Sequence, residues 1–351
     1  MKKKICMVVP SFTAKGGITS VINGYRDSQL TKDYDVRFIE TYCDGNAINK
    51  ALIYIKSIFE YIYLLIIWRA DIVHIHSAFG GSFYRKKYFI DLGHLLRRKI
   101  INHIHGSYYN EFYFEASAYK KKVIKTTYEK CDLFIVLNKS AESNLKKIVP
   151  NKPIEIIENY GILEKKSVQN YMNKKENIIL FLGFVTQKKG CFDIPKISEI
   201  VLREVPDAQF VLGGVGETEK LGKMVNMDHF KFLGWIGGEK KKEWLGKAKL
   251  FFLPSYFEAM PMSILEAMGY GLPIVATNVG GIPSIVRDGI NGFSFLPGDV
   301  EGMANAIVKI LKNSELANKL SENSAEIIAN EYSLDKHIKR IEELYGRLEW
   351  N

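Results

Sequence analysis

Two carboxylates, Glu258 and Glu266, lie eight residues apart in a mostly apolar stretch, SYFEAMPMSILEAMGYGLP (residues 255–273). Proline favours the first turn of a helix, where its missing N–H has no partner to lose. The stretch therefore predicts a helix that starts near Pro261, runs to Met268 and ends at the glycines that follow. Glu258 then lies in the loop before the helix, and Glu266 lies inside it.

The start of that helix is a predicted anion site. The N–H groups of Met262, Ser263 and Ile264 have no partner within the helix, and such groups favour phosphate. A diphosphate there would have a carboxylate on each side, able to accept hydrogen bonds from hydroxyl groups. The alternative is that Glu258 is an ordinary first-turn acid and Glu266 a solvated helix residue, and the pattern alone leaves both open.

Four histidines form two H-x-H pairs, His74/His76 and His103/His105. Residues two apart on a strand share a face, so a zinc site is conceivable. No nearby acid or cysteine completes a typical ligand set, and we therefore predict no metal site. We expect packing roles for three of these histidines and function for His105, which precedes Gly106 at a strand's carboxyl end.

These candidates need a scaffold of strands. Short runs rich in Val, Ile and Phe recur through the chain, and several are continuously apolar, as in strands buried on both faces of a parallel sheet. Helix-like stretches lie between them, such as residues 190–204, 239–247 and 299–330. This alternation predicts a doubly wound α/β architecture. Ligands of such sheets bind beyond the carboxyl ends of the strands, where the candidates fall.

A polar stretch, LEKKSVQNYMNKKE (residues 163–176), interrupts the series and predicts a linker. We expect two Rossmann-like domains, residues 1–165 and 175–332, facing each other across a cleft. The helix predicted for residues 333–351 has no following strand and is expected to pack back on the first domain.

The segment FFLPSYFEAMPMSILEAMGYGLPIVATNVGGIPSIV (residues 251–286) resembles the signature of retaining glycosyltransferases of family four, which have the GT-B fold. Glu258 and Glu266 match its two glutamates in spacing and context. FLGFVTQKKG, VLGGVGE, FKFLGWI and DGINGFSFLPGDVEGMANAI also resemble family motifs, so the resemblance covers essentially the whole second half. It is weaker in the first half, through AKGGITS, DIVHIHS, HIHG and IIENYGI.

The resemblance implies roles in binding a nucleotide-sugar donor. Glu258 would bind hydroxyls of the sugar, Glu266 the ribose diol, and Lys189 would neutralise the diphosphate as the leaving group forms. The chain departs from the family at Phe184, where an arginine is usual. Lys188 is the candidate substitute, although a lysine lacks the planar fork of arginine, and the alternative is a solvated turn lysine.

Further donor contacts are implied outside the glutamate signature. Gly16 and Gly17 follow the first strand and open a helix, and the N–H groups of this loop would face the donor phosphate; glycines also serve ordinary turns. His105 would lie nearest the reacting sugar. Trp235 and Ile236 would border the nucleobase pocket, with an exposed loop aromatic as the alternative.

The chain carries a formal net charge of +10, with basic clusters at residues 85–99 and 120–125. Residues 83–99 predict a basic amphipathic helix that can lie on anionic lipid, and ordinary solvated helices are the alternative. No RNA-binding signature or zinc-finger spacing accompanies the charge, so we expect no nucleic-acid partner.

The hydrophobic segment IFEYIYLLIIW (residues 58–68) is shorter than the roughly 20 apolar residues needed to span a bilayer. We therefore predict that it forms a buried helix. The four cysteines lie far apart and form no CxxC pair, which fits a reducing cytosol. We expect a cytoplasmic protein, peripheral on the inner face of the plasma membrane.

These features predict a hexosyltransferase-type enzyme that needs neither metal nor cofactor, since no DxD-type acid pair suited to Mg²⁺ follows a strand. It would move a sugar from a nucleotide-diphosphate sugar to a saccharide or lipid-linked acceptor in surface polysaccharide biosynthesis, and the family resemblance implies that the transfer proceeds with retention. UDP is the expected nucleotide by base rate. The alternatives are a nucleotide-sugar epimerase on the same fold and a non-catalytic basic protein that binds lipid or nucleic acid.

Overall fold

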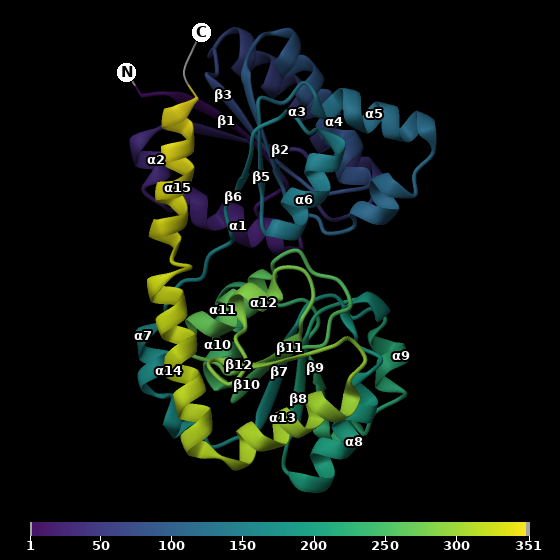
Figure 1. Ribbon diagram of the computed structural model, residues 1–351, viewed down its shortest axis with the longest axis vertical. Helices are drawn as coiled ribbons and strands as arrows, with labels where there is room; N and C mark the ends of the chain where they lie inside the picture. The colour runs from purple at the N-terminus through teal and green to yellow at the C-terminus, as the bar shows by residue number, and fades with distance from the viewer. Residues whose placement is uncertain (1, 349–351) are drawn as a thin grey trace. The chain divides into compact units, whose positions relative to one another are not determined.

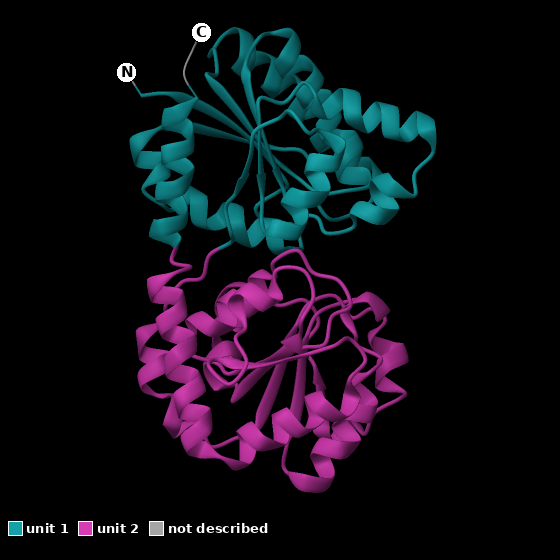
Figure 2. Cartoon of the chain, viewed as in Figure 1, with its two compact units in different colours: residues 1–159, 334–351 teal, residues 160–333 magenta. Residues whose placement is uncertain are grey.

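The computed structural model of the chain describes residues 2–348; Met1 and residues 349–351 lie outside that part. The chain divides into two compact units (Figure 2). Unit 1 comprises Met1–Asn159 and Leu334–Asn351, and unit 2 comprises Tyr160–Ser333. Each unit is a parallel sheet covered by helices (Figure 1).

Unit 1 is built on a six-stranded sheet with the order β2-β1-β3-β4-β5-β6. Its strands are β1 (Lys4–Val9), β2 (Asp35–Glu40), β3 (Ile72–Ser77), β4 (Lys99–Ile104), β5 (Leu133–Val136) and β6 (Ile154–Ile156). Every residue of β3 is buried, as expected of a central strand covered on both faces. β3 pairs in parallel with β4, with His76 opposite His103.

Helices from both ends of the chain cover the sheet of unit 1. They are α1 (Gly17–Arg26), α2 (Leu30–Asp33), α3 (Ala47–Ile66), α4 (Gly81–Leu95), the π-helical η1 (Asn110–Phe114), α5 (Ala118–Tyr128), α6 (Lys139–Ile148) and α15 (Leu334–Arg347). Helix α15 returns from the end of the chain, and its Tyr345 hydroxyl lies 2.5 Å from His74 Nδ1 of β3. This contact joins residues far apart in the sequence within one core.

Unit 2 is built on a second six-stranded sheet, with the order β12-β11-β10-β7-β8-β9. Its strands are β7 (Ile178–Leu182), β8 (Gln209–Gly213), β9 (Phe230–Phe232), β10 (Leu250–Leu253), β11 (Ile274–Thr277) and β12 (Gly292–Phe295). Its α-helices are α7 (Lys165–Gln169), α8 (Ile194–Glu204), α9 (Thr218–Gly222), α10 (Gly238–Lys247), α11 (Met262–Gly269), α12 (Ile282–Ile285), α13 (Val300–Lys312) and α14 (Ser314–Asn330). Short 3-10 turns lie at η2 (Tyr171–Asn173), η3 (Gln187–Lys189) and η4 (Met227–His229).

The doubly wound α/β prediction is confirmed, and two local predictions differ from the structure. The stretch 163–176 is not a linker between the units, because it forms α7 and η2 within unit 2, which begins at Tyr160. Ser167 in this stretch donates a hydrogen bond to the Tyr270 carbonyl at 3.1 Å. The helix expected over 299–330 is two helices, because Asn313 caps α14 by accepting from the Leu316 N–H at 2.9 Å.

The burial predicted for residues 58–68 is confirmed for one face of the helix and wrong for the other. Helix α3 buries Tyr61, Leu64 and Leu65 but leaves Phe59 69% exposed on its other face. Lys86 belongs to the segment 83–99, for which we predict a basic surface, but its side chain is buried and donates to Thr41 Oγ1 at 2.6 Å. Among the described residues, no helix has the length and apolar character needed to cross a membrane.

Both sheets contain a topological switch point, where the strand order changes direction. In unit 1 it lies between β1 and β3, and in unit 2 between β7 and β10. In open α/β sheets, ligands bind at such points, beyond the carboxyl ends of the strands. The sequence candidates lie in the loops that follow these strands or close to them.

Candidate active site

The switch point of unit 2 brings together two of the predicted catalytic residues. Lys189 lies in the turn after β7, and Glu258 lies in the loop after β10. Lys189 Nζ is 2.5 Å from Glu258 Oε1, and the Ser255 hydroxyl donates to the same oxygen at 2.8 Å. Glu258 is buried, so its charge needs these donors.

Backbone contacts hold the two loops together. The Tyr256 N–H donates to the Lys188 carbonyl at 2.9 Å. Gly190 ends the lysine turn with φ of 68°, and a Cβ there would lie 1.9 Å from the Pro254 carbonyl oxygen. Only glycine permits both this backbone conformation and this approach. The contacts between the two loop backbones therefore place Lys189 beside Glu258.

The loop after β11 supports Glu258 from another direction. Gly280 has φ of 58°, and a Cβ there would lie 1.7 Å from the Glu258 carbonyl oxygen. The adjacent Gly281 donates its N–H to the Ala259 carbonyl at 2.7 Å. The glycine pair of the segment NVGG thus fixes the loop that carries the carboxylate.

Glu266 lies on α11, whose predicted bounds are confirmed to within a residue. Its carboxylate accepts from Lys241 Nζ of α10 at 2.7 Å, with about a quarter or less of each side chain exposed. Sequence reasoning missed Lys241, because it stands in a run of three lysines that resembles an ordinary solvated helix face. No local signal marks it, since its partner lies on another helix.

The start of α11 differs in part from the prediction. The Ile264 N–H donates to the Pro261 carbonyl at 3.2 Å, so it closes the first turn and does not face outward. Pro261 is the N-cap, and its carbonyl is placed to accept this bond. The predicted anion site is therefore reduced to the N–H groups of Met262 and Ser263.

The remaining candidates of unit 2 lie near the ends of β7 and β9. The ring of Phe184, in place of the family's arginine, lies 5.1 Å from the ring of Trp235. Ile236 is buried. Lys188 Nζ lies 5.9 Å from the ring centroid of Phe257, the residue next to Glu258. Lys188 therefore lies on the side of the turn that faces the Glu258 loop.

In unit 1, the histidines form one stacked cluster on a face of the sheet. His76 Nδ1 lies 2.9 Å from His105 Nε2, and the rings of His103 and His105 lie 4.2 Å apart. On the covering helices, the Tyr25 hydroxyl lies 2.6 Å from His337 Nε2. Burial, and then the nearby His337, lower the pKa of His105 to about 3. His105 is therefore neutral near pH 7, able to donate or accept a hydrogen bond but carrying no charge.

A metal could be considered at His74, His76 and His103, because their ligand atoms lie within 4.8 Å of one another. The Nε2 atoms of His76 and His103 have no hydrogen-bond partner in the described part of the chain. Neighbouring rings are inclined by only 15–35°, however. Imidazole lone pairs lie in the ring plane, so rings stacked in this way do not converge on one position. The geometry is that of packed neutral rings.

Gly16 and Gly17 lie at the start of α1, after β1, beside the switch point of unit 1. Gly16 has φ of 138°, which other residues rarely adopt, and a Cβ there would meet nothing within 4 Å. The glycine is therefore required by its backbone conformation and not by crowding within the described structure. This arrangement leaves the loop backbone open to a ligand.

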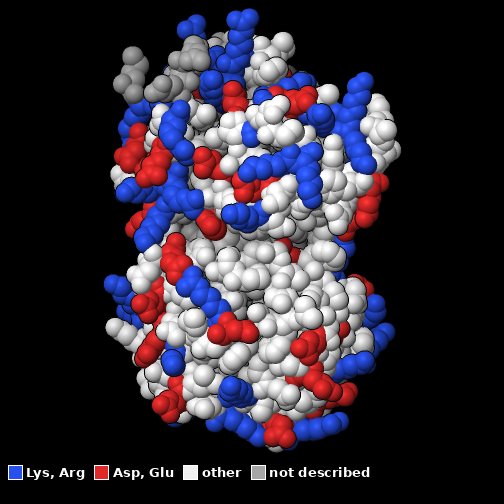
Figure 3. Space-filling model, in the orientation of Figure 1, with Lys and Arg blue, Asp and Glu red and all other residues white. Residues whose placement is uncertain are grey.

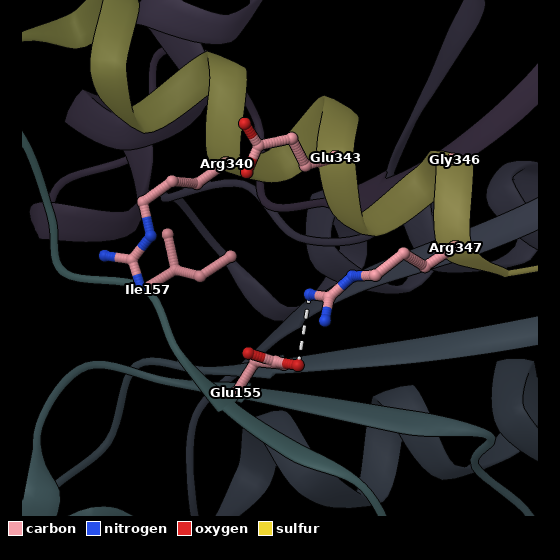
Figure 4. A pocket seen from close by; sticks show the side chains of 6 residues that line it. All are labelled: Glu155, Ile157, Arg340, Glu343, Gly346 and Arg347. Atoms are coloured by element: carbon pink, nitrogen blue, oxygen red, sulfur yellow. Dashed lines mark ion pairs between the residues drawn. The ribbon is translucent and has the colours of Figure 1, made fainter.

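A pocket of about 520 Å³ lies elsewhere in unit 1, between β6 and α15 (Figure 4). Arg347 and Glu155 form an ion pair across it at 3.1 Å. Its lining contains none of the predicted site residues, and Arg340, which also lines it, pairs with Glu158 outside the lining.

Two family models match the chain. "Glycosyl transferases group 1" matches residues 164–327, and "Glycosyltransferase Family 4" matches residues 24–160. The chain belongs to the family-four type of GT-B glycosyltransferases. The two matches meet near the boundary between the two units, so each unit of the glycosyltransferase corresponds to one model.

Named relatives and solved structures agree with this assignment. The glycosyltransferase is 26% identical over 339 residues to an Escherichia coli UDP-Gal:alpha-D-GlcNAc-diphosphoundecaprenol alpha-1,3-galactosyltransferase, covering 88% of this chain and 82% of the relative. It is also 26% identical to the N-acetyl-alpha-D-glucosaminyl L-malate synthase of Bacillus anthracis, covering 78% and 74% of the two chains.

Among solved structures, the sucrose-phosphate synthase of Thermosynechococcus elongatus superposes with a TM-score of 0.80 at 17% identity, covering 99% of both chains. HepE from Anabaena, solved in complex with UDP and glucose, superposes with a TM-score of 0.73 at 15% identity, covering 99% of this chain and 100% of HepE. At such identities these superpositions establish the fold alone.

Proposed function

We propose that this glycosyltransferase moves a sugar, with retention, from a nucleotide-diphosphate sugar, with UDP as the expected nucleotide, to a saccharide or lipid-linked saccharide in surface polysaccharide biosynthesis. The observation that carries the proposal is the ion pair between Lys189 and the buried Glu258 at the switch point of unit 2. The named activity of the E. coli relative, which uses UDP-Gal and a diphosphoundecaprenol-linked sugar, supports the choice of donor and acceptor.

In the proposed reaction the bond between the sugar C1 and the phosphate oxygen breaks, and negative charge accumulates on the departing diphosphate. Lys189 has three N–H donors, of which one serves Glu258, so the others can bind phosphate oxygens. The N–H groups of Met262 and Ser263 and the charge of Lys188 would add to this stabilisation. Such preorganised groups act most strongly where charge develops in the transition state.

The carboxylates would select and orient the donor. Glu258 would accept hydrogen bonds from hydroxyls of the sugar, and Glu266 from the ribose diol. Trp235 and Ile236 would border the base. The proposed roles of Gly16, Gly17 and His105 come from the family resemblance, and the neutral His105 suits a hydrogen bond to a sugar hydroxyl.

The chemistry proposed here uses protein cations and helix dipoles in place of a metal, and no cofactor. We further propose that the enzyme works in the cytoplasm at the inner face of the plasma membrane, with residues 83–99 near the lipid, and that nucleic acid is not a partner. An epimerase remains the second candidate, because the same donor contacts serve both reactions.

Transfer from UDP-sugars to a lipid-linked saccharide, compared between variants of the full chain, tests the proposal. Lys189→Ala should lower turnover about 100- to 1,000-fold, the range seen when one charge-stabilising donor is lost. Lys312→Ala is the matched control, because it removes an exposed lysine that also pairs with a glutamate, Glu204, at 2.6 Å. EDTA should leave transfer intact.

Two results would count against the proposal. Equal turnover of Lys189→Ala and wild type would show that Lys189 does not stabilise the departing diphosphate. Conversion of a nucleotide sugar to its epimer without any acceptor would favour the second candidate.

A further inference from the structure

One face of α3 presents large apolar side chains to solvent. They are Ile48, Leu52, Ile55, Phe59, Tyr63 and Ile66, continued just beyond the helix by Ile67. We call this set the α3 stripe. Their spacing of three or four residues places them on one side of the helix along its whole length. Exposed fractions range from 50% for Tyr63 to 69% for Ile48 and Phe59.

The opposite face of α3 already supplies the core contacts of the helix. Tyr61 is fully buried and donates its hydroxyl to the Phe89 carbonyl of α4 at 2.7 Å. Tyr54 donates to the Arg85 carbonyl at 3.3 Å, and Arg98 to the Leu65 carbonyl at 2.7 Å. Because the inner face holds α3 in place, the α3 stripe is not needed for folding. Contiguous exposed apolar surface of this kind marks an interaction site.

The helices that continue this side of unit 1 add aromatic and basic side chains. Helix α4, which packs against α3, exposes Tyr84, Tyr88 and Leu95, and α5 exposes Tyr119 to 79%. Arg97, Lys122 and Lys125 are exposed as well. Figure 3 shows Lys and Arg side chains standing out at the edge of unit 1 that α5 forms.

Three acidic residues on or directly after these helices are engaged in ion pairs. Glu60 pairs with Lys56 at 3.4 Å, and Asp91 pairs with both Lys87 and Lys130. Glu129 pairs with Lys125 at 3.9 Å. Apart from the buried Lys86, helices α3, α4 and α5 carry eight lysines and arginines against two carboxylates, so the surroundings of the α3 stripe present a net positive charge.

We propose that α3 lies flat in the interface of an anionic phospholipid bilayer, with the α3 stripe among the acyl chains and the neighbouring lysines and arginines at the headgroups. An apolar helix face with flanking basic residues and tyrosines is the composition of interfacial helices. The inference rests on the proposed function in one respect, since a lipid-linked acceptor gives the enzyme a reason to reach the bilayer.

A second copy of the chain fits the α3 stripe less well. A helix of 20 residues is about 30 Å long and about 10 Å wide. A pair of such faces would cover an area of about 300 Å², whereas stable interfaces bury about 800 Å² on each partner. A two-fold contact would also bring the basic surroundings of both copies together, which is unfavourable.

Co-sedimentation of the full chain with vesicles tests the inference. Wild type should bind vesicles of phosphatidylglycerol and phosphatidylcholine at least about 10-fold more tightly than vesicles of phosphatidylcholine alone. The combined variant Leu52→Gln, Ile55→Gln, Phe59→Gln should lose about 100-fold in affinity for the anionic vesicles. All three side chains are exposed, so the thermal unfolding midpoint should not fall.

The matched control combines Met224→Gln, Met227→Gln and Leu296→Gln, which change exposed apolar residues of unit 2. It should bind vesicles like wild type. Equal affinity of the α3 variant and wild type for anionic vesicles would overturn the inference. A wild-type protein that does not bind anionic vesicles would also overturn it. A wild-type dimer in sedimentation velocity that the α3 variant converts to monomer would also overturn it, in favour of a second copy.

UDP binding, measured by calorimetry on the same samples, separates this inference from the proposed function. UDP binding without vesicle binding would refute the membrane inference alone. Vesicle binding without UDP binding would count against the proposed donor alone.

Discussion

Glu258 and Glu266 each have a lysine partner, but only one of the two lysines was a candidate from the sequence. Lys189 stands in a family motif beside the first glutamate, whereas Lys241 reaches Glu266 from a different helix. A carboxylate held by a lysine keeps a defined orientation, which matters for the proposed role of each glutamate in accepting hydrogen bonds from hydroxyls of the donor. In the proposed function, the Lys189–Glu258 pair would act at the transferred sugar and the Lys241–Glu266 pair at the ribose.

Lys241→Ala should weaken UDP binding about 5-fold, because Glu266 loses the contact that orients it toward the ribose. Binding of inorganic pyrophosphate, which has no ribose, should not change. Calorimetry with both ligands measures the difference. Lys242→Ala is the control, since the neighbouring lysine pairs with the exposed Glu239 at 2.7 Å. Equal losses for UDP and pyrophosphate would show that Lys241 contributes charge and not orientation.

At the scale of elements, the site depends on loops that pack backbone against backbone. The turn after β7 is fixed by Gly190 against Pro254, and the loop after β11 by Gly280 against Glu258. Both contacts are made by backbone atoms, yet both set where the side chains of Lys189 and Glu258 lie. These two glycines therefore affect the site indirectly, because they allow the close backbone approach that positions its loops.

Gly280→Ala should destabilise the protein by about 2–4 kcal/mol and lower transfer about 100-fold. The added Cβ must displace the backbone at Glu258, where it would otherwise lie 1.7 Å from the carbonyl oxygen. Gly289→Ala is the matched control, because Gly289 has a similar φ of 69° but open space around it. It should cost about 1 kcal/mol and leave transfer within about two-fold. Chemical denaturation and the transfer assay measure both effects, and equal losses in the two variants would contradict the role of Gly280.

At the scale of the whole molecule, the histidine cluster ties the last helix to the sheet of unit 1. Desolvation by burial lowers the pKa of His74 to about 3 and that of His337 to about 4. The pKa values of His76 and His103 also lie well below the ordinary value. All four side chains are buried, with those of β3 and β4 facing α15, so the cluster is neutral in the folded state.

The stability of unit 1 should therefore fall in mild acid. Above pH 6.5 both folded and unfolded chains hold neutral histidines, and below it the unfolded chain binds protons that the folded cluster excludes. The free energy of unfolding should drop by about 1.4 kcal/mol per pH unit for each such histidine, until the pH nears the folded pKa of 3 to 4. Urea denaturation at pH 7.5, 6.5 and 5.5, in a chain whose other tryptophans are replaced by phenylalanine so that Trp68 of unit 1 reports unfolding, measures this slope.

His337→Gln isolates one histidine from the other acid-sensitive groups. Glutamine can still bond to the Tyr25 hydroxyl and the Glu158 carbonyl, which His337 contacts at 2.6 and 2.7 Å, but it does not titrate. The slope should become shallower by about 1.4 kcal/mol per pH unit. An unchanged slope would show that His337 takes up its proton in the folded state.

The sequence alone determined the parallel architecture, because strands buried on both faces must be continuously apolar, and the loops at their carboxyl ends follow from that pattern. It also determined the bounds of α11 and the place of both glutamates, through local proline and glycine rules. The orientation of each helix on its sheet was decided by the tertiary structure. The partner of Glu266, the burial of Lys86 and the exposure of the α3 stripe depend on that orientation, since contacts between residues distant in the chain select which face of a helix turns inward.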